Sequence, residues 1–186
     1  IPSPHMTPAH MLELGKFIFG KIKTDQYYGV IITHGTDTLE ETAYFIDLYI
    51  DTSIPIIFTG AMRSSNEIGS DGLYNLLSAT RVASSSDAYD RGVLVVLNDE
   101  IHAAEYVTKT STSNVDTFQS PSSGPVGHIM NNNVHFLSKP VKKETFYTAS
   151  LNKNVILLKA YTGMTSEIID SLDSISIDGI VLEAFG

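Results

Sequence analysis

The chain has 186 residues, of which 42% are hydrophobic and 18% charged, and its acidic residues outnumber the basic ones to give a net charge of −9. A domain of this size buries roughly 70% of its unfolded surface, so it can fold without disulfides or structural metal. The acidic balance argues against nucleic acid as a partner. The absence of cysteine excludes disulfide frameworks and thiolate metal sites. No apolar run reaches the ~20 residues of a membrane span. The densest basic cluster is Lys139, Lys142 and Lys143.

Three short runs rich in β-branched residues predict buried strands. They are residues 29–33, 55–59 and 92–97. Because helical stretches connect them, the order β-α-β-α-β favours a parallel sheet with helices on both faces. The predicted fold class is therefore α/β, with a three-layer, mostly parallel sheet of the Rossmann or flavodoxin kind.

Helical periodicity predicts three helices around this sheet. The first begins after Thr7, a capping residue that is followed by proline at the first helical position. The second begins at Thr38, which together with Glu41 has the spacing of a capping box. The apolar faces expected to cover the sheet are Met11, Leu14, Ile18 and Ile22 in the first helix, Leu39, Ala43, Ile46 and Ile50 in the second, and Leu73, Leu76, Leu77 and Thr80 in the third.

The segment that follows the third strand has a different character. Residues 99–125 are polar, rich in serine and threonine, and lack periodicity. A loop of that length in a compact domain is either functional or wrongly assigned. Residues 126–129 and 134–137 then flank an asparagine run, which predicts a β-hairpin.

Two domains are expected. The first covers residues 1–137 and is followed by a linker at 138–154, which has no sustained apolar face. Residues 155–186 have a strand–helix–strand pattern that is too short to bury its own core, so they predict the beginning of a second, smaller α/β domain.

The first candidate site follows the first predicted strand, because open parallel sheets bind ligands at the carboxyl ends of their strands. Gly35 would let the backbone approach a ligand closely. Thr36 supplies a hydroxyl group, and Asp37 supplies a carboxylate that can hold an ammonium group. Ordinary helix capping is the alternative for these two residues, although Thr38 already fills that role.

Lys109 is the second candidate, within a hydroxyl-rich run at residues 108–113. A neutral lysine amine can act as a general base, and with a threonine hydroxyl and an orienting aspartate it would form a variant of the catalytic triad. A solvated surface lysine is the alternative, since the sequence alone does not show that Lys109 reaches Thr36. His102 and Glu105 are spaced so that both side chains would lie on one face of a helix. Without a second histidine pair, this spacing is only weak evidence for a metal site.

The run from His34 to Ala43 resembles the bacterial-type L-asparaginases. Further segments agree with that family in order along the chain. They are Ser3–Pro8, Gly60–Arg63, Ser70–Leu76, Gly92–Asp99, Val107–Thr110 and Asp178–Val181. The first of these segments is more similar to the cytoplasmic members than to the exported ones, and no signal peptide is expected at the start of the chain.

The resemblance implies that L-asparagine is hydrolysed to L-aspartate and ammonia through a threonine acyl-enzyme, with no metal or other cofactor. By this likeness Thr36, Asp37 and Lys109 are catalytic, and Ser3, Thr36 and Asp37 bind the substrate. The partner is then a small molecule, L-asparagine or also L-glutamine, and neither nucleic acid nor membrane. The resemblance also implies a cytoplasmic homodimer or homotetramer.

In the family, a further catalytic threonine lies in an upstream Thr-Gly-Gly-Thr stretch that these residues do not contain. We therefore expect the 186 residues alone to be inactive. One alternative is the amidase subunit of a tRNA-dependent amidotransferase, which carries the same motifs but would need a tRNA-binding surface. Another is a non-catalytic module that binds amino acids with the same loops. A nucleotide-binding flavodoxin-like domain is disfavoured, because no phosphate-binding glycine loop is present.

Overall fold

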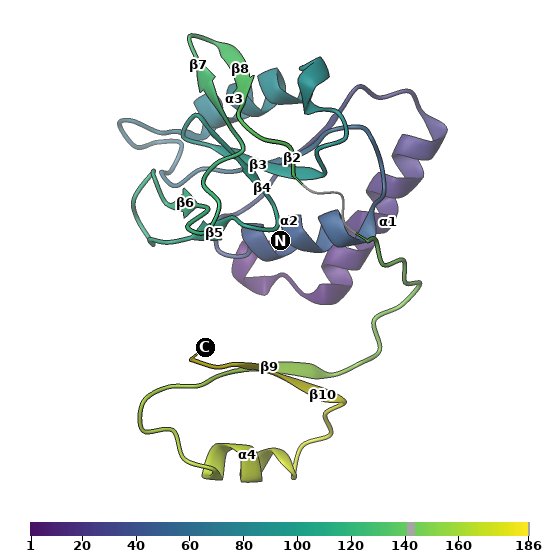
Figure 1. Cartoon of the computed structure of the whole chain (residues 1–186), viewed down its shortest axis with the longest axis vertical. Coiled ribbons are helices and arrows are strands. Elements are labelled where there is room, and N and C mark those ends of the chain that lie inside the picture. Colours follow the sequence, from purple (N-terminus) through teal and green to yellow (C-terminus); the bar gives the residue numbers. More distant parts are fainter. Residues whose placement is uncertain (141–143, 186) are drawn as a thin grey trace. The chain divides into compact units, whose positions relative to one another are not determined.

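The computed structural model describes residues 1–140 and 144–185 and divides the chain into two compact units, Ile1–Ala149 and Ser150–Gly186 (Figure 1). Lys142 and Lys143 of the basic cluster lie outside the described residues, as does Gly186 at the end of the predicted second domain. Within the described part of the chain, every helix is too short or too polar to cross a lipid bilayer.

A six-stranded sheet forms the centre of the first unit, in the order β1-β2-β3-β4-β7-β8. Its parallel half consists of β1 (Val30–Thr33), β2 (Ile56–Thr59) and β3 (Val93–Leu97). These are the three strands that the β-branched runs predicted. Every residue of β2 and β3 is buried, as expected of strands with helices on both sides.

The other half of the sheet is antiparallel, which corrects the expectation of one loop over residues 99–125. β4 (Glu100–Ala103) pairs with β3 through a two-residue turn at Asn98 and Asp99. Their φ angles are 50° and 61°, and asparagine and aspartate tolerate this left-handed region better than most residues. Four residues after a tight turn are too few for a periodic signal in the sequence.

The predicted hairpin is confirmed. β7 (Gly127–Met130) and β8 (Asn133–Phe136) pair in antiparallel fashion. The two residues between them, Asn131 and Asn132, have φ angles of 51° and 66°. Positive φ at both central positions belongs to the turn type whose twist matches that of the flanking strands.

Helices cover both faces of the sheet. α1 (Pro8–Thr24) and α2 (Leu39–Tyr49) pack on one face, and α3 (Gly72–Ala83) packs on the other. The cap predicted for α1 is confirmed, since Thr7 Oγ1 accepts a hydrogen bond from the backbone N–H of His10. The α/β fold class predicted from the sequence is confirmed, with a sheet that is mixed rather than mostly parallel.

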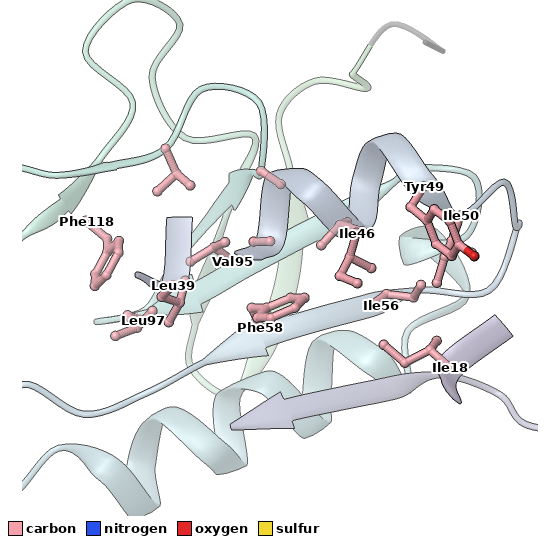
Figure 2. Packing of buried hydrophobic residues seen from close by; sticks show 14 of the residues in the cluster. Ile18, Leu39, Ile46, Tyr49, Ile50, Ile56, Phe58, Val95, Leu97 and Phe118 are labelled. Atoms are coloured by element: carbon pink, nitrogen blue, oxygen red, sulfur yellow. The ribbon is translucent and has the colours of Figure 1, made fainter. Parts of the chain in front are cut away.

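Alternate residues of the central strands belong to two separate apolar clusters, because successive side chains of a strand point to opposite faces. Phe58 lies on the α2 face, whereas its neighbour Ile57 lies on the α3 face. Figure 2 shows Phe58 under α2 with Leu39 and Ile46, and all three side chains are completely buried. This cluster fixes α2 on the sheet and thereby the loop that precedes it.

The predicted apolar face of α3 is wrong. Leu73 is 84% exposed, and Leu76 and Leu77 are also exposed. The helix instead packs small residues against the sheet, and Asn75 donates to Gly60 O and accepts from the N–H of Asn98. These two hydrogen bonds turn the small-residue face of α3 inward. The residues buried in this helix are Asn75, Ser78, Ala79, Val82 and Ala83.

The second unit is a strand–helix–strand, as predicted. β9 (Val155–Lys159) is parallel to β10 (Gly179–Glu183), and α4 (Glu167–Leu172) lies between them in the chain. None of the described residues in 150–185 is fully buried. The division into an N-terminal domain, a linker and the beginning of a second domain stays a prediction.

The packing predicts different effects on stability for substitutions at a buried and at an exposed apolar residue, Phe58 and Leu73. Replacing Phe58 by alanine should lower the free energy of unfolding of the protein by about 3–5 kcal/mol, because it leaves a cavity in the core. The matched substitution Leu73→Ala should change it by less than about 0.5 kcal/mol. Chemical denaturation measures both, and equal losses would contradict the described orientation of α3.

Candidate active site

The loop between β1 and α2 forms one side of the candidate site. β1 ends at Thr33, and residues 34–38 then lead directly into the first turn of α2. Gly35 packs against the N-terminal segment so closely that a Cβ atom there would lie 2.5 Å from Ser3 Oγ. Only glycine fits such an approach, so the sequence of this loop is what allows Ser3 to lie beside it.

Lys109 forms the other side and comes from β5 (Thr108–Lys109), which pairs with β6 (Phe118–Gln119). Its side chain is only 15% exposed. The amine Nζ donates to Thr36 Oγ1 at 3.0 Å and to Asp37 Oδ1 at 2.8 Å. The fold thus brings Lys109 to Thr36 and Asp37, two predicted site residues that lie 73 and 72 positions before it in the sequence.

Ser3, the fourth predicted site residue, is buried beside this group. Its hydroxyl donates to Asp37 Oδ2 at 3.4 Å, and its carbonyl oxygen accepts from the hydroxyl of Thr38 at 2.8 Å. The second contact corrects the predicted capping box. Thr38 precedes α2 as expected, but its side chain accepts no capping bond from the helix, and its hydroxyl donates to the carbonyl oxygen of Ser3.

Glu40 is a residue of the site that the sequence reasoning did not single out. Its carboxylate accepts a hydrogen bond from Thr108 Oγ1 at 3.1 Å and another from the backbone N–H of Lys109. It therefore ties β5 to the first turn of α2, directly beside the motif that carries Thr36 and Asp37. An acidic residue in the first turn of a helix is common for electrostatic reasons alone, so the sequence held no specific signal for this contact.

The electrostatics of the site centre on Asp37. The hydrogen bond from Lys109 and then its charge lower the pKa of Asp37 below its ordinary value. Burial opposes them to a smaller extent, and the hydrogen bond from Ser3 makes the smallest contribution, in the same direction as Lys109. Asp37 is therefore a carboxylate at neutral pH. Its side chain is 54% exposed, which leaves it accessible to a small cationic group.

His102 and Glu105, whose spacing gave weak evidence for a metal site, do not lie on a helix. His102 lies on β4 and Glu105 lies in the turn that follows this strand, so the spacing of a helix does not apply to them. Among the described residues, no group of three or more histidine, aspartate and glutamate side chains could hold a metal ion.

The arrangement of Thr36, Lys109 and Asp37 is suited to proton transfer. A hydroxyl lies within hydrogen-bond reach of an amine, and a carboxylate holds that amine in place. This is the geometry required of a nucleophile, a base and an orienting group.

Comparison with known proteins shows similarity over nearly the whole chain. Residues 1–142 match the family described as "Asparaginase, N-terminal", and the chain belongs to the asparaginase family. It is 42% identical to "Probable L-asparaginase 4" of Schizosaccharomyces pombe over 99% of this chain and 53% of that protein. It is 40% identical to "Probable L-asparaginase periplasmic" of Haemophilus influenzae, over 100% of this chain and 54% of that protein.

The fold is shared with a solved structure, that of a probable cytoplasmic L-asparaginase from Campylobacter jejuni. The two superpose with a TM-score of 0.91 at 36% identity, over 98% of this chain and 60% of that one. The present chain spans about half the length of the curated relatives that it matches.

The contact between Lys109 and Asp37 predicts a change in titration. Lys109→Met removes the donor and the charge, so the pKa of Asp37 should rise towards its ordinary value of 3.8. A lowered pKa in the folded state means that ionised Asp37 stabilises the fold above the unfolded value. That contribution is lost as the pH falls through the folded value. Side-chain carboxyl NMR measures the shift. Lys21→Met, which removes an exposed lysine, should leave Asp37 unchanged.

The close approach at Gly35 predicts a second effect. Gly35→Ala should displace Ser3, because the new Cβ would overlap its side chain, and should lower the free energy of unfolding by about 1–3 kcal/mol. Gly20→Ala is the matched control. A Cβ there meets no atom within 4 Å, and alanine in a helix should stabilise the protein by roughly 0.5–1 kcal/mol. The account would be wrong if Gly35→Ala were as stable as the parent.

Proposed function

We propose that the full-length protein hydrolyses L-asparagine to L-aspartate and ammonia at the site formed by Thr36, Asp37 and Lys109. The observation that carries the proposal is the position of Lys109 Nζ, within hydrogen-bond reach of both Thr36 Oγ1 and Asp37 Oδ1. The names of the relatives from Schizosaccharomyces pombe and Haemophilus influenzae, both probable L-asparaginases, support the substrate.

Thr36 and Lys109 are proposed to move the proton that amide hydrolysis requires. When the amine of Lys109 is neutral, the hydroxyl of Thr36 can donate to it rather than accept from it. The proton of Thr36 then passes to Nζ, and the Thr36 oxygen takes the proton of the hydroxyl group that attacks the amide carbon. Asp37 holds the amine in place and stabilises the ammonium that forms, as the aspartate of a catalytic triad does for its base. The proton is returned to the amide nitrogen as its bond to carbon breaks, which releases ammonia.

The resemblance to the family assigns the acyl-enzyme to a threonine in a Thr-Gly-Gly-Thr stretch outside these 186 residues. In that assignment Thr36 is the second catalytic threonine. The present residues would then supply the base, its orienting carboxylate and part of the substrate-binding surface, and they would need the other segment for turnover.

Substrate binding is proposed for Asp37, Ser3 and Thr36. Half of the Asp37 side chain is exposed, so a lone pair of its carboxylate is free to hold the α-ammonium group of an amino acid. Ser3 Oγ lies next to that carboxylate and is assigned to the α-carboxylate of the substrate. L-Glutamine carries the same two charged groups and is the other candidate substrate.

We also propose a cytoplasmic location and a homodimeric or homotetrameric assembly. The first is supported by the Campylobacter structure, whose title describes a cytoplasmic protein, and by the form of residues 3–8. The relative from Haemophilus is named periplasmic, so fractionation of cells decides the location. The assembly follows from the family resemblance, and sedimentation tests it.

The proposal predicts the effect of three substitutions on ammonia release by the full-length product of the gene. Thr36→Val and Lys109→Met should each lower kcat by about 10³-fold or more, because each removes a member of a unit that acts together. Asp37→Asn should also be severely impaired, because it removes the charge that holds the amine. A coupled assay with L-asparagine, and in parallel with L-glutamine, measures these rates.

The matched controls are Thr24→Val and Lys21→Met, which alter an exposed threonine and an exposed lysine of α1 and should leave kcat unchanged. The 186 residues alone should release no ammonia above the level of their own Lys109→Ala variant. Activity of the full-length Lys109→Met variant at the parental level would refute the proposed role of this site.

A further inference from the structure

His102 is a completely buried polar residue that the proposed reaction does not use. It lies on β4, where its ring Nδ1 is 2.9 Å from the hydroxyl of Ser120, which is itself buried. Its Nε2 is 3.2 Å from Glu100 Oε2, although neither of these two atoms has a hydrogen bond of good geometry among the described residues. The contact with Ser120 is therefore the directional one.

Ser120 comes directly after β6, the strand that holds Lys109 in place. In the β5–β6 pair, Lys109 lies opposite Phe118 and Thr108 lies opposite Gln119. The pair is extended by a hydrogen bond of 2.7 Å from the N–H of Thr110 to Thr117 O. Any shift of β6 along its axis would thus move the backbone of Lys109 with it.

The β5–β6 pair forms a two-stranded sheet of its own, and no backbone ladder among the described strands joins it to the six-stranded sheet. Its position depends on the turn between β4 and β5, where the N–H of Val107 donates to Ala103 O at 3.2 Å, and on side chains. Glu40 of α2 holds the β5 side of the pair, Phe118 packs into the core, and His102 of β4 holds the end of β6. Asn98, in the turn between β3 and β4, also donates to Asp116 Oδ1 at 3.2 Å, two residues before β6, but His102 is the contact that comes from a strand of the main sheet and reaches the end of β6.

The surroundings of His102 keep its ring neutral. Burial, with the charge of His128 on β7 acting in the same direction and that of Asp116 opposing it, lowers the pKa of His102 to about 4. Glu100, on the same strand, has a pKa raised chiefly by burial. A neutral imidazole accepts a hydrogen bond at one nitrogen and donates at the other. Nδ1 accepts the Ser120 hydroxyl in the tautomer that carries its proton on Nε2, the nitrogen that lies 3.2 Å from Glu100 Oε2.

We propose that His102 is a positioning residue for Lys109: its Nδ1 accepts the hydroxyl of Ser120 and fixes β6, which keeps the lysine amine in reach of Thr36 and Asp37. The inference rests on the proposed function, because the position of Lys109 matters for activity only if its amine takes part in the reaction. The position itself can be measured without turnover.

Three substitutions of His102 separate this role from simple packing. His102→Asn keeps an acceptor at the place of Nδ1 but loses volume. His102→Gln places its amide nearer to the site of Nε2, and His102→Leu keeps volume but no polar atom. Ser120→Ala removes the partner hydroxyl with little change in size, so it tests the same bond if a His102 variant fails to fold. Ser123→Ala, at an exposed hydroxyl three residues further on, is the control.

Two quantities are measured for each variant. Carboxyl NMR gives the pKa of Asp37, and hydrogen exchange gives the protection of the Lys109 backbone amide. His102→Leu, His102→Gln and Ser120→Ala should raise this pKa towards 3.8 and speed exchange, whereas His102→Asn and Ser123→Ala should stay near the parent. In the full-length protein, kcat should follow the same order, with losses of about 10- to 100-fold for a misplaced lysine.

Two results would overturn the inference. The first is an unchanged pKa of Asp37 in all His102 and Ser120 variants. The second is an effect that follows lost volume, with His102→Asn the worst and His102→Leu the best. Neither result touches the proposed function, which fails separately if Lys109→Met leaves ammonia release at the parental level.

Discussion

The contact of Lys109 Nζ with Thr36 Oγ1 and Asp37 Oδ1 is the interaction on which the rest of the site depends. It joins a loop at the end of β1 to a short strand pair that belongs to a different sheet. The amine lies where a hydroxyl can exchange a proton with it and where a carboxylate keeps it oriented. The other contacts of the site hold either the loop after β1 or the β5–β6 pair in position.

The loop with Thr36 and Asp37 is held in place by the apolar core under α2 and by the N-terminal segment. The cluster of Phe58, Leu39 and Ile46 fixes α2 on the sheet, and the loop is the direct continuation of that helix. Ser3 packs against Gly35, and its hydroxyl donates a hydrogen bond to Asp37. Packing of α2 thus stabilises the hydroxyl side of the site, whereas the lysine side combines the packing of Phe118 with individual polar contacts.

Much of this architecture is predictable from the sequence because it follows from local patterns. The buried strands, the apolar face of α2 and the hairpin at Asn131 and Asn132 each have a continuous or periodic signal. The apolar face of α3 was mispredicted because the hydrogen bonds of Asn75, which are long-range, decide which side of the helix faces inward. Likewise, periodicity carries no information on the Glu40 and Ser120 contacts, and the family resemblance alone placed Lys109 beside Thr36.

The most direct test of the account is a double-mutant cycle between Thr36 and Lys109, measured as kcat for ammonia release from L-asparagine by the full-length protein. If the hydroxyl and the amine act as one unit, Thr36→Val combined with Lys109→Met should be no slower than the slower single variant. Losses that multiply, so that the double variant falls by the product of the two single effects, would show that the residues act independently and would contradict the account.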